Sequence, residues 1–174
     1  MDAPDRNAAL QRLKDGGVVA VLRGADPDTV VDVATALRDG GVTAFEITAD
    51  TPDATGMIAE LSASFDESEA IVGAGTVLDG GTARDVIAAG AEFVVGPTFD
   101  PEMVATCNRY GVPVAPGVFT PTEALTAYEA GADVVKVFPA SSAGPGHLSS
   151  IAGPLPQIPL MPTGGIDVDN VGDY

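Results

Sequence analysis

Basic residues, cysteine and tryptophan are scarce or missing in this sequence of 174 residues. Eight lysine and arginine residues stand against 25 aspartate and glutamate residues, which gives a net charge of −17, and tryptophan is absent. Nucleic acids and anionic membrane surfaces bind basic patches, so this charge excludes both as expected partners. The single cysteine, Cys107, excludes an internal disulfide. Because Cys107 follows Met103 and Val104 at helical spacing, we predict that it is a buried core residue.

Long hydrophobic runs are also missing. No stretch approaches the roughly 20 apolar residues of a membrane span, and residues 1–5 have neither the basic start nor the apolar run of a signal peptide. We therefore expect a cytoplasmic protein. The acidic residues are spread along the chain, and such a lysine-poor acidic surface suits concentrated salt, which screens the self-repulsion. Unfolding in low salt would support this hypothesis, and full stability in dilute buffer would contradict it.

The residues that are present predict one domain, covering 1–174, because 45% of them are hydrophobic and can form a sizeable core. A short amphipathic helix is expected at about residues 8–15, and strands then alternate with helices. Strands are predicted at residues 18–23, 43–48, 70–76, 93–96, 112–116, 133–139 and 160–163. Helices are predicted to begin at Asp26-Pro27, Thr51-Pro52, Thr82, Asp100-Pro101 and a capping box at residues 120–123.

Strands that alternate with helices indicate an α/β fold with a parallel sheet. The chain has no dinucleotide-binding fingerprint, so the pattern favours a TIM (β/α) barrel over a doubly wound sheet. The sequence reaches only into the seventh expected helix. We therefore expect a C-terminally truncated barrel in which the eighth strand and the last helix are absent.

Lys136 lies in the middle of a run of apolar, mostly β-branched residues that predicts a buried strand. It is one of two lysines, the other being Lys14. Burial of an ammonium group costs several kcal/mol unless the group is paired or loses its proton. One interpretation is an edge strand whose lysine reaches water. The other is a lysine with a lowered pKa, able to attack a carbonyl and form a Schiff base.

Glu46 is predicted to point into the same interior. In the second expected strand, Phe45 and Ile47 share one face and belong under the helices, which leaves Glu46 on the inner face. In the first strand the same alternation points Arg23 inward. A Lys136–Glu46 ion pair that only fixes packing is the structural alternative, although buried pairs are often less stabilising than apolar substitutes.

The last strand is followed by a glycine turn, Gly164-Gly165, which suits a phosphate site because barrels commonly bind phosphate after strands seven and eight. His147 has no partner at metal-ligand spacing, so we interpret it as a solvated loop histidine.

Taken together, these segments resemble the 2-keto-3-deoxy-6-phosphogluconate (KDPG) and 4-hydroxy-2-oxoglutarate (KHG) aldolases. The resemblance runs from about residue 16 to the end of the chain. The segments that carry it are Val-Ala-Val-Leu-Arg at 19–23, Phe-Glu-Ile-Thr at 45–48, Ile-Val-Gly-Ala-Gly-Thr-Val at 71–77, Val-Ala-Pro-Gly at 114–117, Val-Lys-Val-Phe-Pro-Ala at 135–140, Ile-Ala-Gly-Pro at 151–154 and Pro-Thr-Gly-Gly-Ile at 162–166.

This resemblance implies a TIM barrel, usually a trimer, that performs class I aldol chemistry in the Entner–Doudoroff pathway without a metal or other cofactor. The expected partners are a 2-keto-3-deoxy sugar acid and pyruvate. It implies that Lys136 forms the Schiff base and that Glu46 is the general acid and base. The remaining implied site residues are Thr76, Phe138 and Thr163 around the substrate and Gly164 and Gly165 at the phosphate. Arg23 either holds Glu46 ionised or binds the pyruvate carboxylate.

One residue departs from the family pattern: Asp50 stands where many members carry an arginine that binds a substrate anion, which leaves the sugar acid and its phosphorylation open. The leading hypothesis is an aldolase that cleaves a 2-keto-3-deoxy sugar acid, such as 2-dehydro-3-deoxy-6-phosphogluconate, to pyruvate and an aldehyde such as glyceraldehyde 3-phosphate. The alternatives are a truncated, impaired barrel that keeps Lys136 and Glu46 by descent, and another phosphate-binding barrel enzyme.

Overall fold

Parallel strands and helices alternate along the chain in the computed structural model, which describes residues 5–174. The strands are β1 (Val19–Leu22), β2 (Ala44–Thr48), β3 (Ile71–Gly75), β4 (Val94–Val95), β5 (Val114–Ala115), β6 (Gly117–Val118), β7 (Val135–Val137) and β8 (Leu160–Pro162). The helices are α1 (Arg6–Gly16), α2 (Val30–Asp39), α3 (Ala54–Ser64), α4 (Gly80–Ala88), α5 (Pro101–Tyr110), α6 (Pro121–Glu129) and α7 (Pro145–Ala152), with short 3₁₀ helices η1 (Ala140–Ser142) and η2 (Val171–Asp173).

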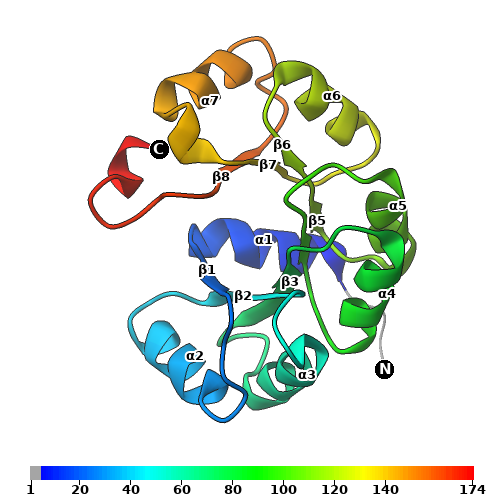
Figure 1. Cartoon of the computed structure of the whole chain (residues 1–174), viewed down its shortest axis with the longest axis vertical. Coiled ribbons are helices and arrows are strands. Elements are labelled where there is room, and N and C mark those ends of the chain that lie inside the picture. Colours follow the sequence, from blue (N-terminus) through cyan, green and yellow to red (C-terminus); the bar gives the residue numbers. More distant parts are fainter. Residues whose placement is uncertain (1–4) are drawn as a thin grey trace.

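The strands neighbour one another in chain order. One sheet has the order β1-β2-β3-β4-β5 and the other the order β6-β7-β8, and all their pairs are parallel. Pro116, which has no N–H to donate, separates β5 from β6. The chain at β7 bonds across this break, because Val134 N, just before β7, donates to Val114 O of β5 at 3.5 Å and Lys136 N of β7 donates to Pro116 O at 3.0 Å. The strands therefore curve around one interior, with α2 to α7 outside them (Figure 1).

The seven predicted strands are confirmed within residues 5–174, the fifth as β5, whereas β6 lies just beyond the predicted range of 112–116 and was not predicted. Over these residues β1 pairs only with β2, and β8 only with β7, so each has one edge without a strand neighbour. Exposure follows from this arrangement. All residues of β2 and β3 are buried, whereas every residue of β1 and β8 is at least partly exposed.

The apolar core lies mainly between the strands and the outer helices. Phe45 and Ile47 of β2 are fully buried there, packed with residues of α3 such as Ile58 and Leu61. Cys107 is buried in the same cluster, which confirms its prediction, and burial raises the pKa of its thiol to about 12.

Helix α1 covers the amino-terminal end of the strands, where Ala9 and Leu13 pack with the first residues of β2 and β3. It begins at Arg6, two residues before the expected helix at 8–15, because the Asp5 side chain caps it. Ion pairs hold α1 in place. Arg6 binds both carboxylate oxygens of Asp133, at 2.9 and 2.7 Å, and Arg12 pairs with Glu92 at 2.5 Å.

Two predicted helix starts are wrong. Asp26 does not cap α2, because its carboxylate accepts the N–H of Asp28 in a local turn and the helix begins only at Val30. Thr51 does not cap α3, because its hydroxyl contacts the Thr48 hydroxyl and accepts the N–H of Gly24.

The other starts are closer to prediction. Asp100 caps α5 and the capping box at residues 120–123 begins α6, as expected. Helix α4 begins at Gly80 rather than Thr82, because Asp79 caps it.

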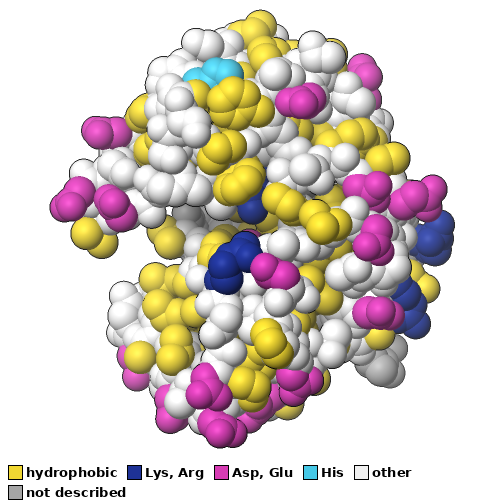
Figure 2. Space-filling view, viewed as in Figure 1, with side chains coloured by type: hydrophobic (Ala, Val, Ile, Leu, Met, Phe, Trp, Pro, Cys, Tyr) yellow, Lys and Arg dark blue, Asp and Glu magenta, His cyan; other side chains and the backbone are white. Residues whose placement is uncertain are grey.

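No helix within residues 5–174 is long and apolar enough to cross a membrane. On the face drawn in Figure 2, acidic side chains are scattered over the surface, and basic side chains lie beside a central hollow and at the right edge.

Candidate active site

An open cavity of about 870 Å³ lies inside the curve of the strands. Side chains from β1, β2, β4, β5, β7, β8 and α1 line it. The predicted site residues in its wall are Arg23, Glu46, Lys136, Phe138, Thr163, Gly164 and Gly165. Thr76 is not in the wall and lies at the rim, where it contacts Arg23. The fold thus gathers residues that are spread over more than a hundred positions of the sequence.

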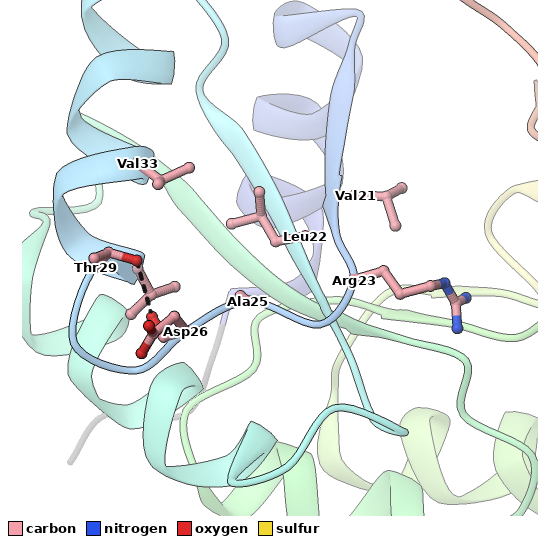
Figure 3. A pocket seen from close by; sticks show the side chains of 8 residues that line it. Val21, Leu22, Arg23, Ala25, Asp26, Thr29 and Val33 are labelled. Atoms are coloured by element: carbon pink, nitrogen blue, oxygen red, sulfur yellow. Dashed lines mark hydrogen bonds between the residues drawn. The ribbon is translucent and has the colours of Figure 1, made fainter.

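Strand alternation directs the charged side chains inward. On β1 and the residue after it, Val21 and Arg23 project to one side, and Leu22 projects to the other, toward Val33 of α2 (Figure 3). Val21 is level with Glu46 in the neighbouring strand, and both line the central cavity. The inward orientation predicted for Arg23 and Glu46 is therefore confirmed.

Lys136 lies at the centre of β7 and is 5% exposed. It is flanked in register by Gly117 of β6 and Met161 of β8, and its Nζ lies 5.2 Å from the centroid of the Phe138 ring. Burial lowers the pKa of the Lys136 amine, an effect that Glu46 opposes and Arg23 assists. The edge-strand interpretation is wrong, because β7 has a strand on each side.

Glu46 lies on the inner face of β2 and is 3% exposed. Burial raises the pKa of its carboxyl group, against the opposing charges of Lys136 and Arg23. Space for the side chain depends on Gly75, because a Cβ at that position would lie 1.7 Å from Glu46 Oε1. No ion pair joins Lys136 to Glu46 among residues 5–174, so the alternative of a purely structural pair has no support.

Arg23 makes contacts that the sequence did not predict. Its Nη1 donates to Asp50 Oδ2 at 2.5 Å, and its Nη2 donates to Thr76 Oγ1 at 3.0 Å. The Thr48 hydroxyl and the Arg23 guanidinium hold the pKa of the Asp50 carboxyl below its ordinary value. Arg23 thus bonds to an acid at the rim rather than to Glu46. The one signal for this arrangement in the sequence was the unusual acid at position 50.

Gly164 and Gly165 form a turn directly after β8, with φ values of 93° and 73° that favour glycine. The turn packs tightly, because a Cβ at Gly165 would lie 2.5 Å from the side chain of Ser141. The carbonyl of Gly164 accepts the N–H of Ser141 at 3.0 Å. Within the described part of the chain, neither glycine N–H has a hydrogen-bond acceptor, so both can bind an anion.

His147 lies on α7 and is half-buried, not in a solvated loop as predicted. Its ring stacks on Phe119 at 4.9 Å, and its Nε2 lies 2.6 Å from the carbonyl oxygen of Phe119. The hydrogen-bonding partner of the His147 ring is therefore a backbone carbonyl 28 positions away, which the sequence pattern did not predict.

The comparison with known proteins agrees with this geometry. Residues 10–174 match the model of the KDPG and KHG aldolase family. The chain belongs to this family of aldolases. It is 40% identical over 167 residues to 2-dehydro-3-deoxy-phosphogluconate aldolase of Treponema pallidum, covering 95% of this chain and 77% of that protein.

Two further proteins of the family are similar to this chain. A probable 2-dehydro-3-deoxy-6-phosphogalactonate aldolase of Rhizobium meliloti is 36% identical, over 90% of this chain and 74% of that protein. The crystal structure of KDPG aldolase from Legionella pneumophila, with pyruvate captured at low pH as a covalent carbinolamine intermediate, superposes with a TM-score of 0.86. It is 32% identical and is matched over 97% of this chain and 80% of that chain.

Proposed function

We propose that this aldolase cleaves a 2-keto-3-deoxy sugar acid to pyruvate and an aldehyde through a Schiff base on Lys136. The observation that carries the proposal is the Lys136 amine, which is 5% exposed, lines the central cavity and has its pKa lowered by burial. A neutral amine is the form that attacks a carbonyl carbon. Family membership supports this chemistry over that of other phosphate-binding barrels.

The reaction begins when the Lys136 Nζ attacks the keto carbon, C2. The carbinolamine that results loses its hydroxyl as water and becomes a protonated imine. This imine accepts the electron pair of the C3–C4 bond while the C4 hydroxyl loses its proton, so that an aldehyde leaves and an enamine of pyruvate remains. A proton added to C3 and hydrolysis of the imine then release pyruvate and restore the amine.

Glu46 is the group that we propose for the proton transfers. Its raised pKa brings the carboxyl group closer to neutral pH, where it can both give and take a proton. It needs to donate to the departing hydroxyl of the carbinolamine and to accept the proton of the C4 hydroxyl. For both transfers, the Glu46 carboxyl group has to lie within hydrogen-bond distance of the substrate oxygen, directly or through one water molecule.

The other predicted site residues take binding roles in this proposal. Phe138 and Thr163 line the cavity next to Lys136 and contact the substrate, and Arg23 and Thr76 bind it at the rim. The free N–H groups of Gly164 and Gly165 favour a phosphorylated substrate such as 2-dehydro-3-deoxy-6-phosphogluconate. An enzyme for this substrate would serve the Entner–Doudoroff pathway.

Replacement of the lysine tests the proposal. Lys136→Met should abolish the release of pyruvate from 2-dehydro-3-deoxy-6-phosphogluconate while circular dichroism stays unchanged. The matched control is Lys14→Met, which removes the other lysine of the sequence and should leave the rate unaltered. Pyruvate release by folded Lys136→Met protein would contradict the assignment.

The second candidate is an impaired barrel, favoured by the unpaired edges of β1 and β8. We propose that the chain forms a single barrel domain and that, over residues 5–174, β1 and β8 each have one edge without a strand neighbour. Addition of the C-terminal segment of the Treponema pallidum relative should then raise the free energy of unfolding and the activity on phosphorylated substrate. Unaltered stability and activity would contradict this part of the account.

Assembly and location are proposed on the same basis. Apolar side chains such as Leu125 and Tyr128 of α6 are partly exposed and could pack between subunits of a trimer. Sedimentation equilibrium would distinguish a trimer from a monomer. A cytoplasmic location is proposed because phosphorylated sugar acids carry several negative charges and do not cross membranes freely.

A further inference from the structure

Three neighbouring strand ends meet at one side of the cavity mouth. Arg23 follows β1, Asp50 follows β2 and Thr76 follows β3, and the guanidinium of Arg23 bonds to both other side chains. Arg23 is the one arginine among the described residues that line the cavity. Any substrate anion that reaches this side of the mouth therefore meets a cation that is already paired.

The Arg23–Asp50 pair carries no net charge. Asp50 is ionised at neutral pH, since its pKa is held below its ordinary value. The side chains of Arg23 and Asp50 are 59% and 50% exposed, so water screens much of their interaction and the effect of the pair on a substrate is modest. A guanidinium has five N–H donors, of which these contacts use two. Arg23 can still donate hydrogen bonds, but the adjacent carboxylate repels a further anion.

The two substrates in the family name, KDPG and KHG, differ in the charge that they carry at C5. KHG is a dicarboxylate whose second carboxylate is C5 itself. KDPG has a neutral hydroxyl at C5 and places its phosphate one carbon further along. Once C2 is bonded to Lys136, C5 lies three bonds away toward the mouth. Arg23 lines the same cavity as Lys136 and Glu46 and is bonded to Asp50 and Thr76 at its mouth, so a substrate that extends from Lys136 toward the mouth would pass it.

We propose that Asp50 is a specificity-determining residue that acts through Arg23. By neutralising the guanidinium, it makes the site discriminate against 2-keto acids that carry a second carboxylate at C5. A hydroxyl at C5, with a phosphate beyond it on the Gly164-Gly165 turn, is accepted instead. This inference rests on the proposed function, because it requires the keto acid to be attached to Lys136.

A competition between two keto acids tests the inference without the need for aldol cleavage. Equal concentrations of pyruvate and 2-oxoglutarate, which has a C5 carboxylate, are incubated with the protein and reduced with borohydride. The two adducts differ in mass and are counted by mass spectrometry. Asp50→Asn should raise the ratio of 2-oxoglutarate to pyruvate adduct about three- to tenfold.

The matched control is Asp28→Asn, because Asp28 is an exposed acid that precedes α2 and has no side-chain contact with Arg23. It removes the same charge and should leave the adduct ratio within twofold of that of the unaltered protein. A rise in both variants, or in neither, would overturn the inference. In an Arg23→Met background the Asp50→Asn effect should vanish. An effect that persists there would overturn the claim that Asp50 acts through Arg23.

The same experiment distinguishes failure of the proposed Schiff-base function from failure of the inference about Asp50. If the unaltered protein forms no adduct with either keto acid, the proposed Schiff-base function fails and the inference fails with it. If pyruvate is trapped but Asp50→Asn leaves the ratio unchanged, the proposed function stands and the inference alone fails.

Discussion

Among the described residues, the arginine side chains at the amino-terminal end of the cavity are paired, whereas the charged side chains deeper inside it are unpaired. At the amino-terminal end, Arg6 is paired with Asp133, and Arg12 with Glu92, and these pairs fasten α1 across the strands. Further along the cavity, Lys136 and Glu46 are more deeply buried and form no ion pair among the described residues. Charges that hold the fold together are paired, whereas the buried charges without a pair cost stability and are explained by chemistry.

The largest expected effect comes from the neutralisation of Glu46. Glu46→Gln should lower turnover by roughly 10²–10⁴-fold, because the amide keeps the shape but cannot transfer a proton. Steady-state kinetics of pyruvate release measure it, and KM should change much less. Glu92→Gln makes the same change in a paired residue at the amino-terminal end of the cavity and should leave turnover unaltered. Equal losses of turnover in the two variants would contradict the contrast between paired and unpaired charges.

A smaller loss should follow when Glu46 is displaced rather than replaced. The Cβ of Gly75→Ala would overlap Glu46 Oε1 and force the carboxylate to move. We expect turnover to fall by about tenfold or more, since misplacement of about 1 Å can cost 10²-fold. Gly146→Ala is the matched control, because a Cβ there has no heavy atom within 4 Å. Unchanged turnover in Gly75→Ala would show that the position of Glu46 does not matter.

Removal of a paired charge should affect stability and not turnover. Arg6→Ala leaves Asp133 partly buried without its guanidinium and should lower the free energy of unfolding by about 1–3 kcal/mol. Urea denaturation measures the loss. The exposed Arg109 of α5 provides the control variant, Arg109→Ala. A loss of turnover with intact stability in Arg6→Ala would contradict a purely structural role.

The smallest effect concerns the stability of the lysine variant. Because burial lowers the pKa of Lys136, this amine opposes folding at every pH below its ordinary pKa, in full below the lowered value and less between the two. Lys136→Met should therefore be as stable as the unaltered protein or more so at neutral pH. The difference should shrink as the pH rises toward the ordinary lysine pKa of 10.5. Urea denaturation over this pH range measures it, and a growing difference would contradict the sign.

Much of this site follows from the sequence because strand periodicity is a strong local signal. The alternation around Glu46 and the apolar run around Lys136 predict which side chains enter the cavity, and the structure agrees. Helix starts are weaker signals. Asp26 and Thr51 have the side chains of caps, yet both form other local hydrogen bonds.

The pairing of Arg23 with Asp50 was beyond sequence reasoning. These residues are 27 positions apart on separate loops, and their contact depends on how two strand ends lie side by side. The free N–H groups of the Gly164-Gly165 turn also emerge only from the full set of backbone hydrogen bonds.

The central claim is that Lys136 is a buried nucleophile kept for Schiff-base chemistry, and trapping of pyruvate tests it most directly. The protein is incubated with pyruvate, reduced with borohydride and digested, and the modified peptide is identified by mass spectrometry. The account predicts one adduct, on the peptide that contains Lys136. An adduct on Lys14 or on the N-terminal amine in its place, or none at all, would contradict it.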